Sequence, residues 1–339
     1  MIDILIKSYN RPYYLDRCIQ SIYRNVLDSN FRIVVLDDGT PKKYLEKIQD
    51  KFPEIDFMFS EFYEEKSKAI LQDKILEKQK TPINMWLSAA KKASEYFVLL
   101  EDDIWFVKPF YLDKVIAQMR PNNGVFTKLF WLGNKDLIQS KKDTKKENLV
   151  EVTPNIPSFN TYWYTFVFFK FKRYKIRWFN EKLKFNTIKK RNSFYSIYSV
   201  AGVLFKKEYF ITLWNNHENE VNEQLQILNA LTFINAFNKK KGKLSFNRTE
   251  SEVVKTGFSS SATDKSFIDS TLKMNVLNKK LNEGWFNESL DAMENFPHDF
   301  SEPYVEGILI EEGALISNSW KQWKSLFKAN YEQFGCNIS

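Results

Sequence analysis

The stretch Val98-Leu99-Leu100-Glu101-Asp102-Asp103-Ile104-Trp105 decides the predicted fold, because an apolar run here ends abruptly in three acidic side chains. Such a run is typical of a strand that is buried on both faces of a sheet. Three adjacent carboxylates are costly to bury unless they are hydrated, protonated or metal-bound. In an open α/β sheet, ligands sit at the carboxyl ends of the strands. The cluster therefore predicts either a site for Mn²⁺ or Mg²⁺, with a diphosphate on its free positions, or an ordinary solvated strand end.

Polar turns also follow two strands that are expected upstream. Residues 2–7 precede Ser8-Tyr9-Asn10-Arg11-Pro12, and residues 32–36 precede Asp37-Asp38-Gly39-Thr40-Pro41. A third strand is expected over 55–62, and helices over 12–27, 42–51, 63–80 and 83–93, the last with Thr81 as N-cap and Pro82 at its first position. This order predicts an α/β fold with a mostly parallel, doubly wound sheet. It also places the polar turns on one edge of that sheet.

The second part of the chain has a less regular pattern. Strands are expected over 124–132, 149–152, 162–171 and 200–205, and helices over 111–120, 218–237 and 319–334. The polar segments 135–148 and 249–264 are typical of solvated or flexible loops. No clear linker interrupts the pattern. We therefore expect one catalytic domain over residues 1–264, with halves 1–115 and 116–264, and a helical C-terminal extension over 265–339.

Composition excludes several classes of protein. The 339 residues are 43% apolar, and the two cysteines, Cys18 and Cys336, form no zinc-ligand or disulfide pattern, which fits a reducing compartment. Neither a signal peptide nor an apolar run of membrane-spanning length is present, so a cytoplasmic location is expected. Neither a phosphate-binding loop with Gly-Lys-Ser/Thr nor a dinucleotide fingerprint occurs.

The net charge of +8 is concentrated in one patch. Basic and aromatic residues interleave from Lys170 to Arg191, a pattern that nucleic-acid-binding proteins share. Since the rest of the chain is not basic, we expect no nucleic acid as a partner. Peripheral membrane contact through this segment, or an anionic acceptor, is the alternative. The last helix has an apolar face that either joins a membrane or packs on the domain, made of Trp320, Trp323, Leu326, Phe327 and Tyr331.

Together, these motifs resemble the glycosyltransferases of the GT-A fold, and family 2 of the nucleotide-sugar transferases most of all. The segments 4–12, 34–40 and 99–103 are similar to the family's nucleoside-lining turn, its aspartate pair and its DxD-type metal motif. The resemblance covers about the first 115 residues, and residues 201–208 resemble the strand before the acceptor-side acid. It implies transfer of a sugar from a nucleotide sugar to a glycan or lipid-linked glycan in surface polysaccharide synthesis. The acceptor-only carboxylate of Asp38 suits the imide N–H of uracil, which favours a UDP-sugar, and a guanine ring, which also offers a donor, is the alternative base. The alternative is a non-catalytic sugar- or nucleotide-binding protein of the same fold.

The resemblance also implies roles for single residues. Ser8, Tyr9 and Arg11 would surround the base and ribose, Asp38 would accept a hydrogen bond from the base, and Asp37 would support it. Asn84 would face the sugar or ribose. Asp103 would bind the metal directly, and Asp102 would bind ribose or metal. The usual glycine-rich stretch before the acidic strand is replaced by residues 82–86.

An inverting transferase also needs a carboxylate that takes the proton of the acceptor hydroxyl. The resemblance places this base after the strand over 201–205, at the start of the next helix. Glu223 is followed by Gln224-Leu225 where the family usually has an acid pair, so Glu223 is the expected base. Glu220 is the second candidate, although charges in a first helical turn also stabilise the helix dipole without any catalytic role.

Overall fold

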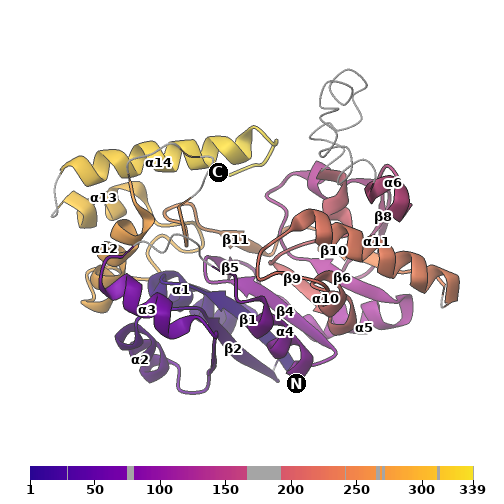
Figure 1. The fold of residues 1–339 in the computed structure, drawn as a ribbon, viewed down its shortest axis with the longest axis horizontal. Coiled ribbons are helices and arrows are strands. Elements are labelled where there is room, and N and C mark those ends of the chain that lie inside the picture. The colour runs from indigo at the N-terminus through magenta and orange to yellow at the C-terminus, as the bar shows by residue number, and fades with distance from the viewer. Residues whose placement is uncertain are drawn as a thin grey trace.

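A sheet of nine strands forms the centre of the protein, in the order β3-β2-β1-β4-β9-β6-β10-β8-β7 (Figure 1). The computed structural model describes residues 1–28, 30–74, 80–165, 192–240, 242–264, 268, 272–310 and 314–338. The strands are β1 (Ile2–Ser8), β2 (Phe31–Asp37), β3 (Asp56–Phe59), β4 (Tyr96–Glu101), β6 (Gly124–Lys128), β7 (Ser140–Lys145), β8 (Val150–Pro154), β9 (Val203–Lys206) and β10 (Ser245–Arg248). Within this sheet β8 and β9 are antiparallel to the other described strands, which are parallel to one another. The prediction of a mostly parallel sheet is therefore confirmed.

The central strands bury side chains on both faces of the sheet. Ile4 and Ile6 of β1 belong to one core, and Leu5 between them belongs to the other. The same alternation runs along β2 and β4, as the pleat of a strand requires. The first core is covered by α1 (Pro12–Asn25), α2 (Lys42–Lys51) and α5 (Leu112–Met119), and the second by α4 (Ile83–Lys92), α10 (Lys207–Leu213) and α11 (Glu223–Lys240). The doubly wound arrangement is therefore confirmed.

The C-terminal helices extend the first core. These are α12 (Met274–Phe286), α13 (Glu302–Ile310) and α14 (Ala314–Glu332). Trp320, Trp323 and Phe327 of α14 are buried in the same apolar cluster as α1. Figure 1 shows α14 lying across the top of this part of the molecule. Most of the apolar face of α14 thus packs on the protein, whereas Leu326 of the same face is exposed, and membrane contact of this helix stays a prediction.

Two segments that were expected as loops are ordered by backbone pairing. Residues 135–148 contain β7, which pairs antiparallel with β8 at the edge of the sheet. An edge strand tolerates many lysines because its side chains reach water. In the segment 249–264, β11 (Val254–Thr256) pairs with β5 (Ile104–Phe106), and Ser259, Ser260 and Ser261 are buried. Neither segment is therefore a plain loop, although the side chains of residues 141–148 are mostly exposed to solvent, as expected.

Capping changes three further boundaries. Asn160 accepts hydrogen bonds from the backbone N–H groups of residues 162 and 163, so α6 (Thr161–Thr165) replaces the start of the expected strand over 162–171. Pro82 rather than Thr81 precedes α4. Asn222 caps α11, whose first residue is Glu223, so this helix begins later than expected. In the segment 63–80, α3 spans Tyr63–Leu71.

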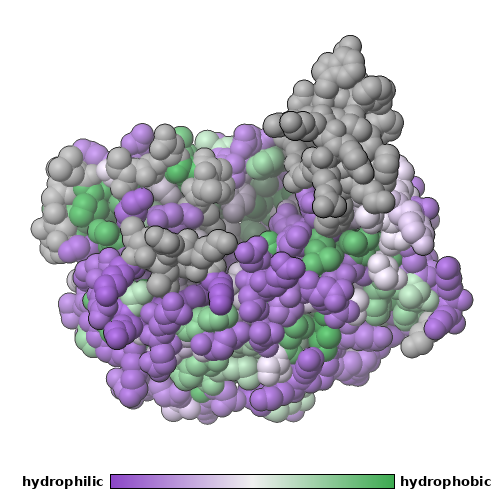
Figure 2. Space-filling view, in the orientation of Figure 1, coloured by the Kyte–Doolittle hydropathy of each residue, from purple (hydrophilic) through white to green (hydrophobic). Residues whose placement is uncertain are grey.

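Within the described part of the chain, no helix is both long enough and apolar enough to cross a membrane. The basic segment from Lys170 to Arg191 lies outside the described residues, so its expected membrane contact is not tested. Figure 2 shows that the visible face is mainly hydrophilic, with a hollow at its upper edge.

Replacing Trp320 by alanine should lower the free energy of unfolding by about 3 to 5 kcal/mol, since Trp320 is fully buried and donates to the Ser259 carbonyl at 2.8 Å. Leu326→Ala is the control on the same helix, because Leu326 is 41% exposed and its loss should cost about 0.5 kcal/mol. Urea unfolding of both variants measures the difference. Equal, small losses would show that α14 is not part of the core.

Candidate active site

The polar turns after β1, β2 and β4 meet at one edge of the sheet, as expected for parallel neighbours. They line a pocket of about 250 Å³, which we call the strand-end pocket. The wall from these turns consists of Lys7, Ser8, Tyr9, Arg11, Asp38, Glu101, Asp102 and Asp103. The structure thus brings together most of the residues that the sequence analysis singled out.

Arg11 connects two of these turns. Its guanidinium donates to Asp103 at 2.8 Å and also to Asp102, which is buried and accepts from the backbone N–H of Tyr9 at 3.2 Å. Desolvation lowers the pKa of Arg11, but the two carboxylates more than reverse this, so the pKa lies above its ordinary value. Desolvation also raises the pKa of Asp102, and Arg11 opposes that rise. Arg11 therefore acts as a fixed cation between two carboxylates.

The turn after β2 holds two aspartates with different surroundings. Asp37 accepts from the backbone N–H groups of Gly39 and Thr40 at 3.0 and 2.7 Å, so it fixes the turn. Gly39 is required here, because it has φ +139° and a Cβ would lie 2.6 Å from Cβ of Lys66. Asp38 pairs with Lys66, a residue of α3. Asp38 therefore faces the strand-end pocket with one cationic partner.

Asp38 accepts two side-chain contacts, and the pKa of its carboxyl group is nevertheless raised. Ser60 donates to it at 2.5 Å, in addition to the contact with Lys66. Desolvation raises the pKa of Asp38 to about 6, although Lys66 and Ser60 both lower it. A carboxylate with this pKa is ionised at neutral pH and can accept a hydrogen bond from a ligand N–H group.

The acidic cluster after β4 offers oxygen ligands of the kind that Mn²⁺ and Mg²⁺ prefer. Glu101 pairs with Lys7 at 2.8 Å, while Arg11 contacts the other two carboxylates. Among the described residues no group of three His, Cys, Asp or Glu is arranged as a ready metal site. A divalent ion here would therefore be coordinated by one or two of these carboxylates and by oxygen atoms of a bound ligand. Asp103 is the best placed, because its side chain is more exposed than that of Asp102.

A second pocket, of about 390 Å³, adjoins the first and contains Glu223; we call it the Glu223 pocket. Glu101, Thr256 and Tyr331 line both pockets. The hydroxyl of Tyr195 lies 3.1 Å from each carboxylate oxygen of Glu223. Although Glu223 is exposed as a residue, desolvation raises the pKa of its carboxyl group, and Tyr195 opposes the rise. The structure therefore places a carboxylate with a raised pKa next to the strand-end pocket.

Two expected site residues lie elsewhere. Glu220 is exposed and is not part of the wall of either pocket. Asn84 is exposed on α4 and donates to Glu61 at 3.0 Å, while Pro82 and Trp86 line the strand-end pocket instead. Residues four apart share a helix face, and Asn84 lies on another face. The structure therefore does not support the predicted contact of Asn84 with a ligand in this pocket.

A loop that was not predicted as part of the site closes the strand-end pocket. Ser260, Ser261 and Ala262 line it, and the hydroxyl of Ser261 is buried without a hydrogen-bond partner in the described structure. The loop is held on several sides, because Tyr13 lies 2.5 Å from the Ser260 hydroxyl and Asn278 donates to the Ser261 carbonyl at 2.9 Å. The signal in the sequence was the run of small residues 259–262, which we interpreted as flexibility.

Lys128 was not predicted as a site residue either. It belongs to β6, lines the Glu223 pocket and is 5% exposed. Its ammonium group donates to the Tyr198 carbonyl at 3.0 Å. Desolvation lowers its pKa to about 7. Lys128 is the last residue of β6, and a single lysine in the longer strand predicted over 124–132 carries no sequence signal for such a position.

Comparison with known proteins identifies the relatives of this chain. The family model described as Glycosyl transferase family 2 matches residues 3–214, which include all three turns of the strand-end pocket. No curated protein matches. Among solved structures, the WbbM bifunctional glycosyltransferase is 13% identical with a TM-score of 0.36, over 68% of this chain and 37% of that one. S. aureus TarS 1–349 is 12% identical with a TM-score of 0.32, over 98% and 91%.

A third similar structure is a mannosyltransferase, PcManGT from Pyrobaculum calidifontis, in complex with GDP-Man and Mn²⁺. It is 12% identical with a TM-score of 0.28, over 38% of this chain and 34% of that one. The chain thus spans little more than a third of the length of WbbM and of the mannosyltransferase.

The perturbed Asp38 predicts a pH dependence of stability. Its pKa is about 6 in the folded protein and about 3.9 when unfolded, so the folded state binds the proton more tightly. This contribution to stability is complete below about pH 4 and is lost as the pH rises through about 6. The free energy of unfolding of the wild type, relative to Asp38→Asn, should therefore fall by about 2 to 3 kcal/mol between pH 4 and 7.

Urea unfolding at several pH values measures this difference, and Asp50→Asn, at an exposed position of α2, is the control with the same change of charge. A difference that rises with pH would mean that the Lys66 contact outweighs the cost of burying Asp38.

Proposed function

The chain belongs to glycosyl transferase family 2 and has the GT-A fold, and we propose that it transfers a sugar from a UDP-sugar to a glycan or lipid-linked glycan with inversion at the anomeric carbon. The observation that supports this most is the shared wall of two pockets, since Glu101, Thr256 and Tyr331 line both the strand-end pocket and the Glu223 pocket. A donor in the first and an acceptor in the second would meet at that wall. We assign the catalytic domain to residues 1–264.

The strand-end pocket suits the nucleotide part of the donor. Tyr9 and Arg11 line it beside Asp38, which is ionised at neutral pH. An ionised carboxylate only accepts hydrogen bonds, so it can bind the imide N–H of uracil. We place Ser8 at the ribose, and Asp37 supports Asp38 by fixing the turn. The buried hydroxyl of Ser261 would form a hydrogen bond with the nucleotide-sugar donor.

A divalent ion, Mn²⁺ or Mg²⁺, would be held by Asp103, with Asp102 as the second carboxylate. When bound, such an ion stabilises the negative charge that develops on the leaving diphosphate. Arg11 keeps both carboxylates in position, since it contacts each of them. Arg11 also partly neutralises the cluster, so that one ion and a diphosphate can enter without a large excess of charge.

Glu223 would take the proton from the acceptor hydroxyl as that oxygen attacks the anomeric carbon. A general base works best when its pKa lies near the pH of the reaction, and desolvation shifts the pKa of Glu223 upward in that direction. Tyr195 orients the carboxylate by donating to it at 3.1 Å.

We place the activity in the cytoplasm, because both cysteines are free and buried, which suits a reducing compartment. The pathway that we propose for it is surface polysaccharide synthesis.

Binding of UDP, measured by calorimetry, should become stronger when Mn²⁺ is present, and Asp103→Asn should lose this increment because the substitution removes a metal ligand. Asp50→Asn, which removes the same charge far from the pocket, should keep it. A wild type that binds neither UDP nor any other nucleoside diphosphate would contradict the proposed function. An Asp103→Asn variant with the full Mn²⁺ increment would contradict the metal assignment alone.

Glu223→Gln should slow sugar transfer by a factor of about 10² to 10⁴, the usual effect of losing a general base, while UDP binding stays unchanged. Glu220→Gln is the matched control, because Glu220 lies outside both pockets and should transfer at the wild-type rate. Product analysis by NMR reports the anomeric configuration. Retention of configuration, or wild-type turnover by Glu223→Gln, would show that Glu223 is not the base of an inverting reaction.

A further inference from the structure

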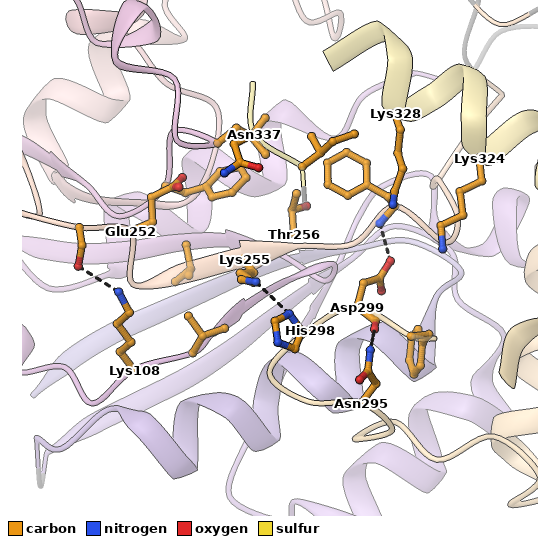
Figure 3. Close-up of a pocket in the computed structure, with 18 of the residues that line it drawn as sticks. Lys108, Glu252, Lys255, Thr256, Asn295, His298, Asp299, Lys324, Lys328 and Asn337 are labelled. Carbon is orange, nitrogen blue, oxygen red and sulfur yellow. Dashed lines mark hydrogen bonds between the residues drawn. The ribbon is translucent and has the colours of Figure 1, made fainter. Parts of the chain in front are cut away.

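A third cavity, of about 570 Å³, lies beside the two pockets (Figure 3). We call it the lysine cavity, because Lys108, Lys255, Lys324 and Lys328 line it. It shares Thr256 and Phe258 with the strand-end pocket. Thr256 lines the Glu223 pocket as well, so the three cavities meet at this residue of β11.

The lysines come from separate parts of the chain. Lys108 follows β5, Lys255 belongs to β11, and α14 carries Lys324 and Lys328. Figure 3 shows the last two extending from the helix toward the loop with His298 and Asp299. Four positive charges from three parts of the chain therefore gather around one cavity, together with the carboxylates of Glu252, Asp299 and Glu302. Like charges repel, so lysines without a direct acidic partner favour the entry of an anion.

Two of the three carboxylates of this cavity, those of Glu252 and Asp299, accept hydrogen bonds from neighbouring loops and side chains. Glu252 accepts from the backbone N–H groups of Trp131 and Gly133, each at 2.7 Å. Asp299 accepts from the backbone N–H of Phe258 and from the Ser259 hydroxyl, each at 2.8 Å, and from Tyr14 at 2.9 Å. These contacts hold the loops of the cavity wall in place and take up the oxygens of both side chains.

Only one lysine of the cavity has an acidic partner among the described residues, since Lys324 lies 3.3 Å from Glu302. Lys108 contacts the Ser251 hydroxyl at 3.1 Å. Lys255 lies 3.2 Å from Nδ1 of His298, and because an ammonium group only donates, that nitrogen accepts. Within the part of the chain that the structure describes, Lys108, Lys255 and Lys328 have no carboxylate within ion-pair distance.

We propose that the lysine cavity binds an anionic group of the acceptor, a phosphate or a carboxylate, while the reacting hydroxyl of that acceptor lies at Glu223. This inference rests on the proposed function and adds the chemical class of its acceptor. The lysines supply charge and hydrogen-bond donors that a phosphate or carboxylate can use together. A neutral glycan would leave three ammonium groups of the cavity without a direct ion-pair partner, since Glu252 and Asp299 in the same wall are bonded to backbone and hydroxyl donors. The connection through Thr256 lets one acceptor chain reach both cavities.

The test compares the double variant Lys255→Gln/Lys328→Gln with the wild type, after UDP and Mn²⁺ have been added to fill the strand-end pocket. Titrations with glucose 6-phosphate, glucuronate and glucose, followed by NMR, measure the preference for an anion. The wild type should bind at least one of the charged sugars about tenfold more tightly than glucose, and the variant should lose this preference. Preference for glucose 6-phosphate identifies a phosphate as the group, and preference for glucuronate identifies a carboxylate.

Lys92→Gln/Lys239→Gln is the matched control, because both lysines are exposed and lie outside the three cavities. It should keep the wild-type preference. Equal binding of charged and neutral sugars by the wild type, or a preference that survives in Lys255→Gln/Lys328→Gln, would overturn the inference while intact UDP binding leaves the proposed function standing. A wild type that does not bind UDP would overturn the proposed function, and the acceptor role of the cavity with it.

Discussion

Arg11 lies between Asp102 and Asp103, and this buried contact joins the turn after β1 to the turn after β4. Carboxylates that follow one strand repel each other, and burial makes their charges more costly. The acids that line the pocket at these strand ends therefore each have a cationic partner, whereas Asp37 is held by the backbone N–H groups of its own turn. Lys7 is the partner of Glu101, and Lys66 is the partner of Asp38. Buried ion pairs add little stability by themselves, so their persistence here fits a site that has to hold charge in a fixed place.

The rest of the chain is arranged around this charged edge. The segment that follows β11 forms one wall of the strand-end pocket, and the hydrogen bond from Trp320 to the Ser259 carbonyl links this segment to α14. The C-terminal helices thus share the core of the sheet and also position a loop at the site. Because Thr256 lines all three cavities, a ligand in any one of them lies next to the others.

Much of the fold could be predicted from the sequence, because the apolar alternation and the turn residues are local signals. The strand ends at Ser8, Asp37 and Glu101 are of this kind, and parallel neighbours bring them together without further information. The structure also places Glu223 beside the strand-end pocket, although its catalytic role stays a prediction. The role of Asn84 came from the resemblance alone, and although α4 begins at residue 83 as predicted, Trp86 lines the pocket while Asn84 does not. The pairing of Lys66 with Asp38, the burial of Ser261 and the position of Lys128 depend on long-range packing, which single residues do not reveal.

A crystal structure of the protein with UDP and Mn²⁺ tests the central claim most directly, namely that the charged edge of the sheet is the donor site. The account predicts uracil within hydrogen-bond distance of Asp38, and the diphosphate with its metal at Asp103. UDP bound among Lys108, Lys255 and Lys328 instead, or a base far from Asp38, would contradict it.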